Sequence, residues 1–253
     1  MSEENPKYPI DTIQEALCEF RLRPAAEHSW SPKHAGDIFK ALGTEDYPGM
    51  ESVPEIGMEL SIGAGGQPQQ KMIQGPPKFR FTRADEKQVV QVSAQLFVVN
   101  VLAPYPGWQV VRNEILTKWQ MLQSILRPEV IERIGLRYIN RIPSGRDTRV
   151  AQWLRESPFI PGAIDKAETG IKFRFEAGLA PDHTIIVSVF RDLSEARNGD
   201  ILFDIDRGHF LRRSLASEEI ADLIDRLHID VYGVFSEAKT EMLEQYLQGK
   251  LKR

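Results

Sequence analysis

Cysteine is nearly absent from this sequence: among 253 residues, Cys18 is the single example. A disulfide bond within the chain and a cysteine-rich metal site are therefore both excluded. The five histidines do not fall into HExxH or a similar ligand spacing, so we predict no metal site and no bound cofactor. Cys18 lies on the apolar side of an alternating segment, which predicts a buried, unreactive thiol.

Two further absences concern location and charge. No run of about 18 apolar residues occurs, so no membrane span is expected. The first residues, MSEENPKYP, are polar and lack the apolar stretch of a secretory signal, which favours a cytoplasmic protein. The formal net charge is −4 and the isoelectric point about 5.8. Nucleic-acid binding through bulk charge is therefore disfavoured, whereas a local basic surface stays compatible with this composition.

Catalytic motifs are also lacking, and no catalytic residue can be named. The glycine-rich stretch Gly63–Gln70 is not followed by Lys-Ser/Thr and has no GxGxxG spacing, so we interpret it as a hairpin loop. Asp204, Asp206 and His209 form the densest polar cluster. It could hold a divalent ion or move a proton, but a solvent-facing strand that ends in a glycine turn is the favoured interpretation. The sequence thus leaves enzymatic activity open and favours a non-enzymatic protein.

Alternating and helical patterns predict an α+β protein. The expected strands are 13–23, 53–62, 78–82, 89–102, 131–142, 170–177, 184–191 and 200–206. The expected helices are 30–42, 108–126, 149–155 and 217–247, the last with a bend near Gly233.

The tetrapeptide KFRF occurs twice, at Lys78–Phe81 and Lys172–Phe175. A strand, a helix, about three strands and a long helix surround each copy in the same order. We therefore predict two related halves, 10–128 and 129–250. Each would be an antiparallel sheet with a long helix on one face, and the two could join into one continuous sheet. The phenylalanines of KFRF are expected in the core and its arginines on the outside.

The candidate binding residues are arginines that share strand faces, namely Arg80, Arg133, Arg137, Arg141 and Arg174. Such a guanidinium surface suits phosphates or acidic side chains. If the first strands of the two halves pair, however, Glu15 and Glu19 would face Arg133 and Arg137. Internal neutralisation by these two glutamates is the interpretation that the sequence favours.

Three motifs together resemble a known family: EALCEFRLRP at 15–24, LAPYPGW at 102–108 and IERIGLRYINRIP at 131–143. They are similar to a sporadically distributed family of uncharacterised bacterial proteins of about this length, and the likeness extends from Tyr8 to Tyr246. Because that family has no established activity, the resemblance assigns no functional residue. Its patchy distribution implies a mobile-element or defence context.

Three functions agree with these observations. The first is a non-enzymatic binding or accessory protein that recognises another protein. The second is an RNA-binding or RNA-processing protein with a basic sheet face, on which Tyr138 or Phe210 would stack with bases. The third is a small-ligand site between the sheet and the long helices. We favour a protein partner over nucleic acid, expect no membrane association, and find no sequence signal for the oligomeric state.

Overall fold

The fold is that of a computed structural model, which describes residues 8–27, 30–62, 68–155, 170–193, 199–213 and 215–251. Its strands are β1 (Ile13–Pro24), β2 (Gly49–Ile62), β3 (Pro68–Thr82), β4 (Gln88–Ser93), β5 (Leu96–Leu102), β6 (Pro128–Ile142), β7 (Gly170–Ala180), β8 (His183–Asp192) and β9 (Ile201–Arg213). Its helices are α1 (Pro32–Leu42), α2 (Trp108–Leu126), α3 (Val150–Trp153), α5 (Ser217–Ala238) and α6 (Glu241–Leu247).

All nine strands belong to one antiparallel sheet with the order β2-β3-β4-β5-β1-β6-β9-β8-β7. The α+β class predicted from the sequence is confirmed, and the sheet is continuous. The first strand of each predicted half, β1 or β6, lies at the centre, and the two pair antiparallel along most of their length. Residues of these two strands therefore dominate the middle of both sheet faces.

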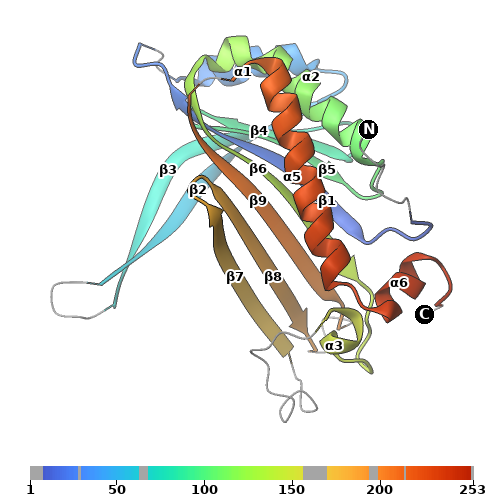
Figure 1. The fold of residues 1–253 in the computed structure, drawn as a ribbon. Helices are drawn as coiled ribbons and strands as arrows, with labels where there is room; N and C mark the ends of the chain where they lie inside the picture. Colours follow the sequence, from blue (N-terminus) through green and yellow to red (C-terminus); the bar gives the residue numbers. More distant parts are fainter. Residues whose placement is uncertain are drawn as a thin grey trace.

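The helices gather on one face of the sheet, which we call the helix face (Figure 1). There α2 contacts β1 and β5, while α5 crosses β6 and β9. Strand alternation sends Ala16, Cys18 and Phe20 to this face, and all three are buried. The intervening residues, among them Glu19 and Arg21, point to the opposite side, which we call the open face.

Apolar side chains fill the space between the sheet and the helices. The stripe predicted for residues 108–126 is confirmed, because α2 has these bounds and buries Val111, Ile115, Trp119, Leu122 and Leu126. The ring of Trp119 stacks on Phe20 with 4.8 Å between centroids. Cys18 is fully buried in the same core, and burial raises the pKa of its thiol well above the usual range.

Two predicted elements are divided in the structure. The strand expected over 89–102 is a hairpin, since β4 ends at Ser93 and β5 begins at Leu96. The helix expected over 217–247 does not bend near Gly233 and continue; it ends at Ala238. Lys239 is extended, and Thr240 begins α6 by accepting a hydrogen bond from the Leu243 amide. Apolar periodicity continues across both breaks, so the pattern alone concealed them.

The two KFRF copies lie on β3 and β7, where each strand pairs with the next strand in the chain. Phe81 is fully buried, as expected, but Phe175 is 46% exposed. The prediction of a core position is therefore wrong for Phe175. Phe175 lies on β7, the last strand of the sheet. Helix α5 packs on β6 and β9 and does not reach far enough to cover this strand. Within the described residues, no helix is long and apolar enough to cross a membrane.

Candidate functional site

The open face is hollowed into a trough of about 570 Å³. It lies over β1, β6, β9, β8 and β7, which are five consecutive strands of the sheet. Its lining consists of Glu19, Arg21, Arg133, Arg137, Arg174, Glu176, Ala177, Gly178, Thr184, Ile186, Asp204, Asp206 and Phe210. Four of these residues are arginines and four are carboxylates, so the formal charge of the lining is zero.

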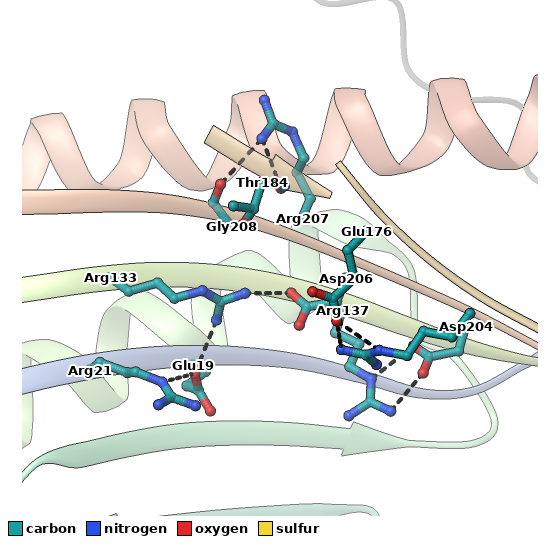
Figure 2. A network of polar contacts seen from close by, with 11 residues as sticks. Glu19, Arg21, Arg133, Arg137, Glu176, Thr184, Asp204, Asp206, Arg207 and Gly208 are labelled. Atoms are coloured by element: carbon teal, nitrogen blue, oxygen red, sulfur yellow. Dashed lines mark hydrogen bonds and ion pairs between the residues drawn. The ribbon is translucent and has the colours of Figure 1, made fainter. Parts of the chain in front are cut away.

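Arg133 is the most enclosed charged group of the trough, with 10% of its side chain exposed. Its guanidinium lies 3.0 Å from Glu19 Oε1 and 2.7 Å from Asp206 Oδ1 (Figure 2). It lies over Gly135 and Gly208, which are cross-strand partners. A Cβ atom on either glycine would come within 2.2 or 2.6 Å of the guanidinium. Both positions therefore have to lack a side chain for this ion triad to form.

Arg137, four residues after Arg133 on β6, forms a second ion pair, which is bidentate. Its Nε is 2.8 Å from Asp204 Oδ1 and its Nη2 is 2.6 Å from Asp204 Oδ2. This hydrogen bonding raises the pKa of Arg137, so its positive charge is held firmly. The side chain of Arg137 is 40% exposed, which leaves part of the guanidinium accessible from the trough. Asp204 is thus a positioning group for an arginine that a ligand can reach.

The structure brings together some of the predicted arginines and separates others. Those that line the trough are Arg133, Arg137 and Arg174. Arg141 lies outside the lining, and its Nε is 2.7 Å from Asp200 Oδ2. Arg80 lies on β3, which β4 and β5 separate from β1. By strand register Arg80 lies on the open face too, but three strands from β1 and outside the trough.

Internal neutralisation of the arginines is present, but the partners differ from the predicted ones. Glu19 pairs with Arg133 rather than with Arg137. Glu15 instead accepts a hydrogen bond from the Asn100 amide, and Arg137 pairs with Asp204 of β9. The alternation of Asp204 and Asp206 placed both on one face correctly. The sequence carried no signal that β9 would be the neighbour of β6, so their role as partners was missed.

His209 does not join the two aspartates, because it points to the helix face. There it lies against His183 of β8, with 4.1 Å between ring centroids. The buried Arg207 donates hydrogen bonds to His183 Nδ1 and to Asp230 of α5. His183, His209 and Asp230 border a second cavity of about 350 Å³. No group of three or more histidine, cysteine or acidic residues in the described ranges could hold a metal ion.

The LAPYPGW motif forms part of a polar row at the helix–sheet interface. Trp108 stacks on His228 at 4.1 Å and donates its indole N–H to Asp225 at 3.0 Å. His228 Nδ1 lies 3.1 Å from the Tyr138 hydroxyl, which in turn lies 3.1 Å from the Tyr105 hydroxyl. Burial lowers the pKa of His228 to about 4, so this imidazole is neutral at neutral pH.

The two aromatic residues that the RNA hypothesis invoked lie on opposite faces of the sheet. Tyr138 is buried on the helix face and cannot stack with bases on the open face. Phe210 does lie in the trough, where it is 45% exposed, and the lining also includes the apolar Ile186. The trough therefore combines paired charges with one accessible aromatic ring.

No protein-family model matches the chain, and a search of curated proteins finds no significant match. The side chains of the trough therefore carry the argument for a function.

Proposed function

We propose that the chain is a non-enzymatic binding protein whose trough receives a segment of a partner protein. The observation that supports this proposal is the charge balance of the trough: four arginines and four carboxylates, mostly held in ion pairs, surround an exposed aromatic ring. A polypeptide segment that bears both acidic and basic side chains can exchange partners with such pairs. Specificity then comes from the complementary arrangement of charges.

Two side chains are suited to supply most of the affinity. Phe210 presents a large apolar surface, and Arg137 presents the accessible part of a guanidinium that Asp204 already orients. Aromatic residues and arginine are the types that most often dominate binding energy at protein interfaces. Because Asp204 holds Arg137 before binding, little conformational entropy of this side chain is lost when the partner docks.

The two alternative functions receive less support. A polyanion such as RNA gains affinity from basic groups that neutralise its phosphates, whereas the arginines of the trough are balanced by carboxylates. A small ligand between sheet and helices would have to use the smaller cavity beside α5, which His183, His209 and Asp230 border. Elsewhere in that layer buried side chains such as Phe20 and Trp119 fill the space. A segment of protein thus suits the site better than either alternative.

We also propose that residues 10–128 and 129–250 descend from one duplicated unit. Outward from the centre, β1-β5-β4-β3 on one side matches β6-β9-β8-β7 on the other, and β2 is additional. The KFRF strands, β3 and β7, occupy equivalent places in this scheme. On this proposal the trough combines β1 of one unit with the open face of the other.

The cellular setting is proposed from the sequence alone. The resemblance to a sporadically distributed bacterial family suggests a partner in a defence or mobile-element system.

The test compares partner capture by wild-type protein and by a trough variant. Tagged wild-type protein, Phe210→Ala and the control Ile229→Ala would each be exposed to lysate of cells that encode the protein. Ile229 is also an exposed apolar residue, but it lies on α5 across the sheet from the trough. We expect wild type and control to retain the same polypeptide and Phe210→Ala to lose it. With purified partner, calorimetry should show an affinity loss of about tenfold or more.

A mobility-shift series on RNA completes the test. Binding of RNA that weakens steeply with salt, together with no polypeptide that distinguishes wild type from Phe210→Ala, would overturn the proposal in favour of nucleic acid. Equal retention of one polypeptide by all three proteins would also overturn it, because the trough would then play no part in recognition.

A further inference from the structure

We propose that two copies of this chain associate by antiparallel pairing of their β7 strands, about a two-fold axis through Phe175. The proposal rests on the outer edge of the sheet and does not depend on what the trough binds. The charges along β7 favour a second copy of the same strand as the partner of this edge.

β7 is the last strand of the sheet, and among the described residues its ladder partner is β8 alone. The edge also carries accessible side chains, since Phe175 is 46% and Leu179 58% exposed. Such an edge presents unpaired backbone N–H and C=O groups, which another strand can satisfy. A strand of 11 residues, Gly170–Ala180, is long enough for a regular antiparallel ladder.

The charges of β7 select one register for pairing with itself. With the two-fold axis at Phe175, Arg174 lies opposite Glu176 of the second copy, and Glu176 opposite its Arg174. Lys172 then faces Gly178 of the second copy. Each dimer thus contains two cross-strand pairs of opposite charge, a favourable arrangement on neighbouring strands. Within the single chain Arg174 and Glu176 pair with each other, and their side chains are 57% and 59% exposed. The dimer therefore exchanges the exposed pair of each chain for two pairs between chains.

The adjacent registers are unfavourable because they bring like charges together. With the axis moved to Arg174, that arginine would face its own copy. With the axis moved to Glu176, two carboxylates would face each other. A shift that places the axis between two residues would turn the second copy over. Its open face would then continue the helix face of the first copy. The register centred on Arg174 also places Lys172 opposite Glu176, but only with two guanidinium groups facing each other. The register centred on Phe175 is the one of these that pairs opposite charges and brings no like charges together.

The other face of β7 is compatible with the same register. Phe175 would meet Phe175 of the second copy, and Phe173 would meet Ala177. Phe175 and Ala177 point to the helix face, since their β8 partners are Val187 and Ile185 of the apolar core. Pairing would therefore cover the aromatic ring that the end of the sheet leaves exposed, and apolar burial would add to the charge pairing.

Association has a consequence for the trough, because Arg174 and Glu176 belong to its lining. In the dimer, each trough would border the same two residues of the second copy. The two sheets would also become one, with a trough on either side of the two-fold axis.

The decisive experiment uses two single charge reversals, Arg174→Glu and Glu176→Arg. Either variant alone brings like charges together at both cross-strand contacts of its own dimer. Mixing the two variants restores opposite charges at both contacts of a heterodimer. We expect wild type to sediment as a dimer of twice 28.8 kDa. Each variant alone should dissociate about tenfold or more readily, and the mixture should regain the dimer.

Rescue in the mixture is specific to a contact between chains, since an effect within one chain cannot be repaired by another molecule. Arg21→Glu is the matched control: it reverses an exposed arginine of the trough, on β1, away from the edge. It should leave the dimer intact. Wild type that sediments as a monomer up to its solubility limit would overturn the proposal. A dimer that survives both single reversals would overturn it as well.

Discussion

Arg133 and the two glycines beneath it are one structural unit. The guanidinium can be enclosed between Glu19 and Asp206 because Gly135 and Gly208 leave it room. A buried charge that lost this geometry would be costly, since its carboxylate partners would lose their compensation as well. The RIG and RGH segments of the sequence thus carry a packing requirement that composition and periodicity do not reveal.

At this scale we predict that Gly208→Ala lowers the free energy of unfolding by about 1–3 kcal/mol. The new Cβ would lie 2.6 Å from Arg133 Nη2, so the guanidinium has to move off one of its carboxylates. Gly178→Ala is the control, because a Cβ there meets no atom within 4 Å. Urea unfolding of the two variants measures the difference, and equal stability would contradict this account.

His228 provides a pH-dependent prediction. Its pKa is lowered from 6.5 to about 4 by burial, while the nearby Asp225 opposes that effect. The folded state therefore binds this proton less readily than the unfolded chain. The contribution of the neutral, buried His228 to the free energy of unfolding is complete above about pH 6.5. This contribution is lost as the pH falls toward 4. Its full size corresponds to roughly 3 kcal/mol.

His228→Phe removes the titrating group but keeps a ring that can stack on Trp108. We expect its unfolding free energy to fall less steeply than that of wild type between pH 6.5 and 4, as denaturant titrations at several pH values would show. Parallel curves for the two proteins would argue against a neutral, buried His228.

At the scale of elements, the division between α5 and α6 depends on local hydrogen bonds. Thr240 accepts a hydrogen bond from the Leu243 amide at the start of α6, and its hydroxyl donates to the Gln152 carbonyl oxygen of α3 at 2.6 Å. One side chain therefore caps one helix and ties it to another. The apolar stripe of the sequence runs across this point, which is why one long helix was predicted there.

We predict that Thr240→Ala destabilises the fold by about 1 kcal/mol through loss of the cap. The matched control is Thr117→Ala, which changes an exposed threonine within α2 and should be neutral or slightly stabilising. Thermal unfolding followed by circular dichroism distinguishes the two. Similar melting temperatures for both variants would show that the cap contributes nothing.

At the scale of the whole molecule, the central β1–β6 pair joins the two predicted halves. The pairing covers Ile13 to Pro24, and the ion triad of Arg133 crosses the same boundary through Glu19. Separation of the halves would expose the edges of both central strands and the apolar core that α2 and α5 share. Each half alone is therefore short of the burial that a stable domain requires.

We accordingly predict that 10–128 and 129–250 do not fold when produced separately but assemble when produced together. Solubility and cooperative thermal unfolding are the measurements, with the intact chain as the reference. Cooperative unfolding of 10–128 on its own would refute the prediction and would show that this half is an independent domain.

The sequence by itself determined the class of the fold, most elements and the face on which each strand residue lies. Residues 108–126 were predicted as the helix that α2 proves to be, because periodicity of apolar residues is a local property. The same reasoning placed Cys18 in the core and Arg133 on the opposite face of the sheet.

Tertiary structure alone decided which strands are neighbours, and with them the composition of the trough. Asp204 and Asp206 are partners of Arg137 and Arg133 because β9 pairs with β6, a contact between residues some 70 positions apart. Strand pairing depends on the energy of the whole sheet, and no local pattern encodes it. The charges of the trough and their neutralisation could therefore be inferred from the sequence, but which carboxylate pairs with which arginine required the fold.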